Sequence, residues 1–485
     1  MKKLGILGPF ACAILLAACG GGDDAKTGDD QNLTEDEEQL LVDVEGYVVG
    51  DFISGNKANA IASFDKACEA WKSSVADVGG NRFLDATCGE PEQLADFLFG
   101  AKTTASFLAV VPRGVEAVHA TQHTVLGKLE SNLVDKVRTW NEACAAEVER
   151  ARAIHGKKLL SATCLAPMPD PEFGYYTSAF ETVTVPDDIG VVEIAGTLVP
   201  EHHSNLAPTL ELWSKACGDW ADGSAEISGS HLVSYECGAP TQVDFIDDFR
   251  FTSETRLRVQ TGKRGATPSS GPWFEGVHAN LTESLTAWNT ACAAELEAER
   301  ALFGERLLAA SCGQLAHSDN WSFEGAVNKV VAGAGATKVT VDGWVMGYIS
   351  GNRANARADW TKRYRRWLDG MVAAVGVEHI EGHEAAMPEA AKEPTWFYNA
   401  PTKLHLGIDL AEGETLVSEV SKVTIPSSGN FDTRVDAWEK ACSDAVAKAA
   451  SAAGDAFVAA GCGKTTLTQS WGFESDFTVW TRQKK

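Results

Sequence analysis

Ten of the twelve cysteines form five pairs with one spacing, which suits a disulfide, a metal site or a redox dithiol. The two members of each pair are 20 positions apart: Cys68/Cys88, Cys144/Cys164, Cys217/Cys237, Cys292/Cys312 and Cys442/Cys462. Structural zinc sites use about four ligands at short chelating spacings, and the chain contains no Cys-x-x-Cys stretch. A redox dithiol is also typically closer in sequence. The spacing therefore favours structural disulfides.

The pairs mark copies of one repeated unit, because their first cysteines recur at intervals of 76, 73, 75 and 150 positions. The last interval is two periods, so a copy without cysteines is expected inside it. Residues 351–367, GNRANARADWTKRYRRW, match residues 55–71, GNKANAIASFDKACEAW. In this fifth of six copies, Tyr364 and Glu384 stand at the two cysteine positions, so both cysteines are missing together.

Each copy predicts one long helix that contains the first cysteine position. Asparagine is a preferred N-cap, and one stands twelve positions before the cysteine position: Asn56, Asn132, Asn205, Asn280, Asn352 and Asn430. Glycine commonly follows a helix end, and one stands twelve positions after it: Gly80, Gly156, Gly229, Gly304, Gly376 and Gly454. This interval corresponds to about 23 helical residues, roughly 35 Å. A large aromatic residue four positions before the cysteine shares its apolar stripe: Phe64, Trp140, Trp213, Trp288, Trp360 and Trp438.

The rest of each copy predicts about three antiparallel strands. A short strand after the glycine leads to the second cysteine, and a strand such as 338–348 precedes the next asparagine. Between them, an aromatic pair is expected on one face of a strand: Phe97/Phe99, Phe173/Tyr175, Phe249/Phe251, Trp321/Phe323, Trp396/Tyr398 and Trp471/Phe473. A helix on a β-meander is similar in outline to cystatin or β-lactamase-inhibitor modules, although no motif of those families is present.

The predicted fold class is therefore α+β, with six tandem modules, each one long helix packed on a small antiparallel β-meander. Five modules are expected to contain an internal helix-to-strand disulfide, which would stabilise the small core of a unit of about 75 residues. The expected boundaries are 44–112, 113–189, 190–265, 266–335, 336–417 (no cysteines) and 418–485.

The N-terminus carries the pattern of an export signal. Lys2 and Lys3 precede an apolar run that is too short to span a bilayer and ends in Leu-Ala-Ala-Cys at Cys19. This order resembles the lipobox signal peptide of bacterial lipoproteins. The resemblance implies that residues 1–18 are removed and that Cys19 carries a lipid anchor. Because Gly20 replaces the aspartate that favours inner-membrane retention in Gram-negative lipoproteins, an outer-membrane or cell-surface location is expected.

Residues 19–43 predict an acidic, flexible tether, since the stretch 20–43 contains nine acidic residues and one lysine. The formal charge of the chain is −25, and it becomes −27 when Lys2 and Lys3 are removed with the signal. Such a charge argues against nucleic-acid binding through a broad basic face. The expected partners are the membrane, through the lipid, and a protein or an envelope polymer. No cofactor is expected.

Two stretches contain part of a known site motif. GCGKTT, which ends at Thr466, lacks the glycine that a phosphate-binding loop needs at position 458. HIEGHE lacks the histidine that a zinc-protease motif needs at position 387. Its two histidines, His379 and His383, are expected on a strand about 13 Å apart, too far to share one ion. No metal site is therefore expected.

The fifth copy carries the only basic cluster that the pattern singles out: Arg353, Arg357, Arg363, Arg365 and Arg366. The first two replace apolar residues of the helix stripe. One interpretation is a local site for an acidic partner or a lipid headgroup. The other is a helix packed against acidic neighbouring modules, with arginine stems covering apolar surface. The sequence leaves both open.

No residue is identified as catalytic, because the chain shows no nucleophile–base signature. Repeats that differ outside their scaffold positions are typical of extended binding surfaces. The leading hypothesis is a non-enzymatic, lipid-anchored binding or structural protein of the cell envelope, an inhibitor-like role included. The alternative is an envelope hydrolase with its site in or beside the fifth module.

Overall fold

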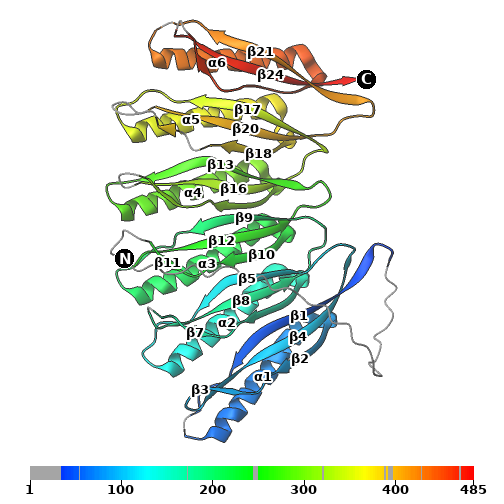
Figure 1. Ribbon diagram of the computed structural model, residues 1–485, viewed down its shortest axis with the longest axis vertical. Helices are drawn as coiled ribbons and strands as arrows, with labels where there is room; N and C mark the ends of the chain where they lie inside the picture. The colour runs from blue at the N-terminus through cyan, green and yellow to red at the C-terminus, as the bar shows by residue number, and fades with distance from the viewer. Residues whose placement is uncertain are drawn as a thin grey trace, which may run out of the picture.

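Six α+β modules follow one another along the long axis of the computed structural model (Figure 1). The structure describes residues 34–53, 55–171, 173–243, 249–318, 322–386, 389–390, 397–427, 429–468 and 471–484. Each module packs one long helix on a small antiparallel sheet, as the sequence predicted. Cys19 and most of the predicted tether lie outside the described residues.

The helix of every module has 23 residues. The helices are α1 (Lys57–Gly79), α2 (Leu133–His155), α3 (Leu206–Ser228), α4 (Leu281–Phe303), α5 (Arg353–Val375) and α6 (Phe431–Ala453). The predicted asparagine accepts a hydrogen bond from the first turn in five helices, and only the side chain of Asn205 makes no such bond. Every helix ends at the predicted glycine in a left-handed conformation, which glycine adopts without steric cost.

Four strands accompany each helix, one more than expected. We call them leading, return, short and central, in chain order. The leading strands are β1 (Glu37–Val49), β5 (Val118–Leu126), β9 (Val191–Leu198), β13 (Ala266–Val277), β17 (Thr337–Met346) and β21 (Glu414–Ile425). The return strands are β2 (Phe83–Cys88), β6 (Leu159–Cys164), β10 (Leu232–Cys237), β14 (Leu307–Cys312), β18 (Ile380–Ala385) and β22 (Phe457–Cys462).

The short strand was not predicted because it holds only two to four residues. The short strands are β3 (Glu92–Ala95), β7 (Met168–Pro169), β11 (Thr241–Gln242), β15 (Ala316–Ser318), β19 (Glu389–Ala390) and β23 (Thr466–Leu467). The central strands are β4 (Leu98–Pro112), β8 (Tyr176–Thr184), β12 (Phe251–Gln260), β16 (Ser322–Ala332), β20 (Tyr398–Ile408) and β24 (Phe473–Lys484). The central strand pairs antiparallel with the other three strands of its sheet.

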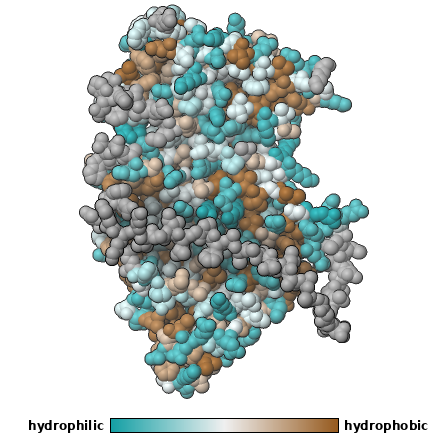
Figure 2. Space-filling view, in the orientation of Figure 1, coloured by the Kyte–Doolittle hydropathy of each residue, from teal (hydrophilic) through white to brown (hydrophobic). Residues whose placement is uncertain are grey.

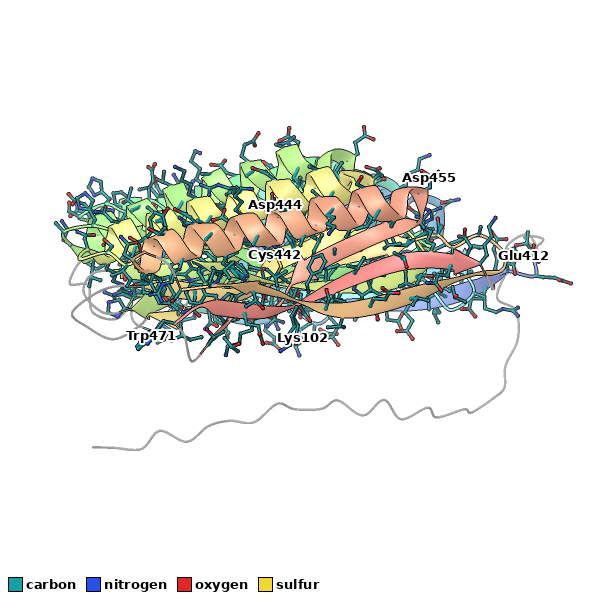
Figure 3. All side chains as sticks on the ribbon, turned by 90° about the horizontal axis from the view of Figure 1, so that it is seen from above. Lys102, Glu412, Cys442, Asp444, Asp455 and Trp471 are labelled. Carbon is teal, nitrogen blue, oxygen red and sulfur yellow. A yellow bond between two sulfur atoms is a disulfide. The ribbon has the colours of Figure 1, made fainter. Side chains whose placement is uncertain are left out.

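Helices and sheets form two layers when the stack is viewed from its end (Figure 3). Lys102 lies on the sheet side away from the helices, whereas Asp444 lies on the helix layer. The face shown in Figure 2 is a mosaic of polar and apolar side chains. Among the described residues, no helix has the length and apolarity needed to cross a membrane.

Some segments differ from the expected boundaries and conformations. Strand β1 begins at Glu37, inside the segment predicted as tether, and β21 begins at Glu414, before the expected boundary at 418. Each of these two strands pairs with its central strand up to the last residue of that strand. Each therefore begins earlier than the sequence pattern predicted.

In the first, third and last modules the first aromatic of the pair, Phe97, Phe249 or Trp471, precedes the central strand, so the two rings do not share a strand face. In the second module both aromatics precede β8. Trp321 and Trp396 lie outside the described residues. The chain is left-handed at Phe97 and Trp471, which sets the ring apart from the strand that follows.

Five disulfides join helix to return strand, as predicted, with Cα–Cα distances of 5.9–6.3 Å. The helix runs away from its cysteine to the terminal glycine, and the return strand comes back beside it. The second cysteine therefore lies level with the first, and the bridge closes a helix–turn–strand unit inside one module.

Neighbouring modules meet where the leading strand and helix of one cover the return strand of the next. The second residue of the return strand is buried in five modules, with exposed fractions of 0–3% for Leu160, Val233, Leu308, Glu381 and Val458. Leu160 packs with Val42, Val44 and Val75 of the first module. Leu84 holds the same position in the first module, against whose return strand no other module packs in the described part of the chain, and is 52% exposed. Stacking thus completes the core of each module.

The junctions alternate between two kinds. At the odd-to-even junctions the helix lies closer to the next return strand, α1 against β6 and α3 against β14. The odd helices carry a tryptophan three positions after the cysteine position: Trp71, Trp220 and Trp367. At the even-to-odd junctions strands lie closer, β5 along β10 and β13 along β18, and charged groups are buried between modules. The junction of the fifth and sixth modules combines both features, since the buried Arg363 of α5 pairs with Asp436 of α6.

Close approach at an odd-to-even junction depends on Gly196 of β9. A Cβ atom there would lie 2.7 Å from the carbonyl oxygen of Cys312 in the next module. Gly196→Val should therefore lower the free energy of unfolding by about 1–3 kcal/mol, measured by urea denaturation. Ser421 occupies the same sheet position in the last module and is exposed. Ser421→Val should leave stability within about 0.5 kcal/mol, and equal losses in both variants would contradict the junction.

The Cys292–Cys312 bridge should stabilise the fourth module. Replacing both cysteines by alanine should lower the free energy of unfolding by roughly 3 kcal/mol, because the unfolded chain loses a constraint. Urea denaturation of the variant and of the oxidised protein measures the difference. Denaturation midpoints that are equal for the reduced and oxidised forms of the unaltered chain would rule out a stabilising role.

Candidate functional site

The arginines at the start of α5 lie against acidic residues of the fourth module. Arg353 Nη2 is 3.1 Å from Glu324 Oε1, and Arg357 pairs with both Glu275 and Glu324. The guanidinium of Arg357 also lies over the Trp273 ring, 4.6 Å from its centroid. Burial lowers the pKa of Arg357 to about 10, so the group stays charged at neutral pH.

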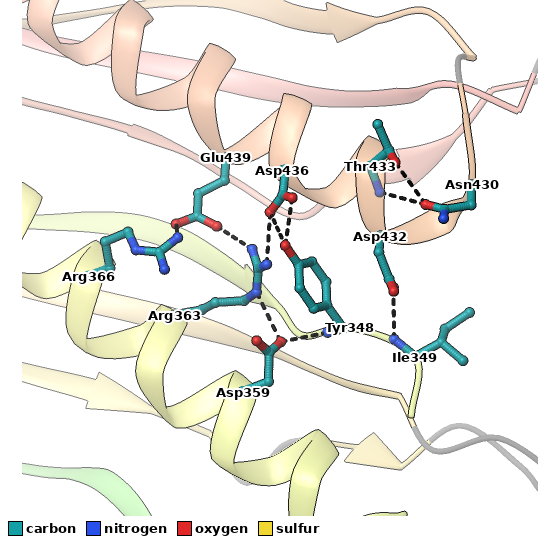
Figure 4. Close-up of polar contacts among 10 residues, drawn as sticks. All are labelled: Tyr348, Ile349, Asp359, Arg363, Arg366, Asn430, Asp432, Thr433, Asp436 and Glu439. Carbon is teal, nitrogen blue, oxygen red and sulfur yellow. Dashed lines mark hydrogen bonds and ion pairs between the residues drawn. The ribbon is translucent and has the colours of Figure 1, made fainter. Parts of the chain in front are cut away.

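The arginines in the middle of α5 face acidic residues on both sides. Arg363 pairs with Asp359, at 3.0 Å, and with Asp436 of α6, at 2.8 Å (Figure 4). Burial opposes its charge, but these carboxylates and Glu439 raise the pKa of Arg363. Arg366 Nη1 lies 2.8 Å from Glu439 Oε1, and Arg365 pairs with Glu295 of α4.

All five arginines that the sequence singled out are therefore matched by carboxylates of this chain. This arrangement corresponds to the second of the two interpretations, a basic helix packed between acidic modules. The ion pairs tie α5 to the fourth module on one side and to the sixth on the other, so the basic cluster holds the stack together.

The missing disulfide of the fifth module is replaced by a hydrogen bond between the same elements. Tyr364 Oη of α5 donates to His383 Nδ1 of β18 at 2.6 Å. His383 Nε2 lies 2.9 Å from Glu299 of α4, whose carboxylate also lies 3.4 Å from Lys329 Nζ. Burial, followed by the charge of Lys329, lowers the pKa of His383 to about 4, so a neutral ring bridges Tyr364 and Glu299. Glu384, at the second cysteine position, instead faces His405 at 3.1 Å.

A related buried cluster joins the second and third modules. Tyr235 Oη donates to Glu147 of α2 at 2.7 Å, and His123 Nε2 lies 3.3 Å from the same carboxylate. The ring of His155 stacks on Tyr235 at 5.5 Å, and both of its nitrogens are buried without a hydrogen-bond partner among the residues that the structure describes. Burial, followed by the charge of Lys158, lowers the pKa of His155 to about 4.

These clusters contain the residue types of acid–base chemistry but offer no access to a substrate. Glu299, His383 and Tyr364 have exposed fractions of 0%. His383 and Lys329 both lie against Glu299 Oε2, whereas Glu299 Oε1 is buried without a hydrogen bond in the described part of the chain. The contacts of this cluster join modules. Within the described ranges, no group of three or more His, Cys, Asp or Glu residues is placed to hold a metal ion.

A groove of about 800 Å³ between α5 and α6 is the best candidate for a binding site. Apolar side chains of both modules line its floor and walls: Trp344, Met346, Trp367, Met371, Trp438 and Val446. The ion pairs of Arg363 and Arg366 with α6 form part of its rim (Figure 4). Its volume and lining are in the range of small-molecule sites, which are mostly apolar with a few polar groups.

Small residues line the groove at a position where the junction of the second and third modules has a large side chain. Arg150, six positions after the first cysteine of α2, lies across α3. A Cβ atom at its neighbour Gly218 is already 2.7 Å from the guanidinium carbon. The equivalent residue of α5 is Gly370, and a Cβ atom there would meet open space. The C-terminal half of α6 adds Ala447 and Ala450 to the lining.

One polar group beside the groove lacks a protein partner. Trp344 is 9% exposed, and its Nε1 is buried without a hydrogen bond in the described part of the chain. The ammonium of Lys464 lies 5.4 Å from the centroid of the same ring. Lys464 does not line the groove, and Trp344 Nε1 is not exposed in it.

Sequence reasoning missed the groove and the buried clusters, because both arise between modules. The signals are present: Gly370 stands where the second module has Arg150, and acidic Glu147 and Glu295 alternate with the junction tryptophans. Comparison with known proteins gives no match to a protein-family model, a curated protein or a solved structure. The protein is therefore defined by its architecture, a tandem array of disulfide-bonded α+β modules with a groove at the last junction.

His155 should make the fold sensitive to acid. Folded His155 takes up its proton only near pH 4, whereas the unfolded residue does so near 6.5. The unfolded state therefore binds more protons between these values, and stability falls as the pH is lowered through this window. Phe303 holds the same place in α4, so His155→Phe is structurally conservative.

The His155→Phe variant should be at least as stable at pH 7 and should lose less stability between pH 7 and pH 4, by up to about 3 kcal/mol. Urea denaturation across this range measures the change. Parallel pH profiles for the variant and the original chain would contradict the assignment.

Proposed function

We propose that this chain is a lipid-anchored protein of the cell envelope or surface that binds its partner without chemical conversion. The lipobox-like sequence ending at Cys19 supports the anchor. The five disulfides support an oxidising compartment outside the cytosol. Gly20 favours the outer membrane or the cell surface over the inner membrane.

The groove between α5 and α6 is the observation that carries the binding role. It is about 800 Å³ in volume, and its lining is mainly apolar. A cavity of this size with a mainly apolar lining and a few polar groups commonly marks a ligand site in folded proteins. The groove also lies beside the fifth module, the copy whose cysteines are missing.

The alternative function, an envelope hydrolase in or beside the fifth module, lacks comparable support. A hydrolase needs a nucleophile and a base that a substrate can reach. His383 and Glu299 have exposed fractions of 0%, and their hydrogen bonds are directed at each other and at neighbouring residues of the array. The binding role therefore accounts better for the geometry.

Filling the groove should abolish binding of an apolar probe. Gly370→Trp places a large ring where a Cβ atom meets open space, and any residue other than proline suits a helix better than glycine. An anilinonaphthalene sulfonate dye should bind the complete six-module chain, with enhanced fluorescence, and the variant should lose at least about tenfold in affinity.

Gly223→Trp provides the matched control, because Gly223 holds the same repeat position in α3 and also faces open space. The control should keep the dye affinity of the original chain. Absence of dye binding to the original chain, or equal binding by both tryptophan variants, would overturn the groove as the binding site.

A further inference from the structure

The two even-to-odd junctions share one arrangement, in which a ring of one module stacks on a ring of the next. Two residues before the end of the return strand, the third module has Tyr235 and the fifth has His383. The last residue of the preceding helix stacks on this ring. The centroids of His155 and Tyr235 are 5.5 Å apart, and those of Phe303 and His383 are 5.9 Å apart.

A buried carboxylate from the same helix completes each ring pair. Glu147 of α2 accepts a hydrogen bond from the Tyr235 hydroxyl at 2.7 Å, and Glu299 of α4 lies 2.9 Å from His383 Nε2. Each joint therefore consists of two side chains from a helix and one from the next return strand. One of its two rings is an imidazole in both cases.

The odd-to-even junctions have a side chain that does not titrate at this place. Alanine stands at the same return-strand position in the second, fourth and sixth modules: Ala162, Ala310 and Ala460. The fifth-to-sixth junction does bury charge, in the Arg363–Asp436 pair. Burial opposes ionisation of Asp436, but hydrogen bonds from Tyr348 and Arg363 lower its pKa, so this pair persists in mild acid.

Protonation of His155 would place an uncompensated charge in the first joint. Both ring nitrogens are buried without a hydrogen-bond partner among the described residues, and Lys158 adds a second cation. The carboxylates on the surrounding elements already pair with Tyr235, Arg150 or Lys158. The other ionisable groups around this joint are Glu147 and Arg150 of α2, His123 of β5, Asp222 of α3 and Asp187 of the loop before β9.

Protonation of His383 would disturb the hydrogen bonds of the second joint. Its Nδ1 accepts from the hydroxyl of Tyr364 at 2.6 Å, so an added proton there would leave that hydroxyl in need of another acceptor. Burial and the charges of Lys329 and Arg365 oppose the proton, and the attraction of Glu299 does not offset them. The remaining ionisable groups around this joint are Glu295, which pairs with Arg365, and Glu384.

We infer that the two even-to-odd junctions are acid-sensitive joints, at which the array separates when His155 and His383 take up protons. The modules themselves and the odd-to-even junctions stay intact, so opening gives three pairs of modules joined by the chain. The inference does not depend on the proposed binding function, because the groove lies at the fifth-to-sixth junction.

The direction of the pH dependence follows from the two states of a joint. In the open joint water reaches the imidazole, which binds a proton near its ordinary pKa of about 6.5. In the closed joint burial lowers the pKa of each histidine to about 4. Opening therefore takes up one proton per joint between these values. Its equilibrium constant rises as the pH falls, by up to about 300-fold per joint.

Small-angle X-ray scattering of the complete chain between pH 7 and pH 4 tests the inference, with in-line size-exclusion chromatography so that only monomers are measured. The radius of gyration should rise reversibly in acid, whereas far-ultraviolet circular dichroism should keep its neutral value. Hydrogen exchange, corrected for the intrinsic rate at each pH, should increase at least about tenfold in β10 and β18 but not in β6 and β14.

Each joint supplies a replacement for the other that does not titrate in acid. His155→Phe introduces the residue that ends α4, and His383→Tyr introduces the residue that β10 has at this position. The double variant should keep its neutral radius of gyration down to pH 4. His278→Gln, a change at an exposed histidine before α4, should open like the original chain.

The inference is overturned if the original chain stays compact at pH 4, if expansion and loss of helicity coincide, or if the double variant expands as the original chain does. If the double variant is unfolded at pH 7, His155→Phe alone decides. Exchange in β10 must then keep its neutral level in acid while β18 still opens, and opening of both strands would contradict the inference.

Discussion

Burial of the return strand by the preceding module is the constraint on which the rest of this structure depends. One helix on a four-stranded sheet covers one sheet face but leaves both edge strands open. Leu160 and Leu308 are fully covered only because the previous helix and leading strand lie over them. A module of about 75 residues therefore completes its core with atoms of its neighbour, as expected for a repeat array.

The disulfides stabilise contacts within a module, whereas the buried polar clusters stabilise contacts between modules. Each disulfide fixes helix to return strand inside a module, on the face where the first cysteine is buried. The Tyr364–His383 bond spans the same two elements, but His383 also reaches Glu299 of the preceding module. Loss of the covalent bridge therefore goes together with a polar link between modules. The cost of burying Glu299 is offset by Lys329 and His383, which lower the pKa of its carboxyl despite burial.

Structural features that depend on residues of one module could be predicted from the sequence. Features that depend on contacts between two modules could not. The helices follow from the asparagine and glycine positions, and the disulfides from equal spacing, because these signals are local. The groove is lined by residues of two modules, such as Gly370 and Ala447, which are 77 positions apart. The role of the arginines likewise depended on partners such as Glu275 and Asp436, whose proximity no local pattern reveals.

The last module shows why the groove occurs at this end of the array. In the second and fourth modules the helix faces the next module with large or charged residues, such as Glu147, His155 and Phe303. The equivalent positions of α6 are Ala445 and Ala453. Small residues continue around this half of α6 to the side that faces α5. The junction therefore has ion pairs at one end and a groove lined by small and apolar residues at the other, beside the module that has no disulfide.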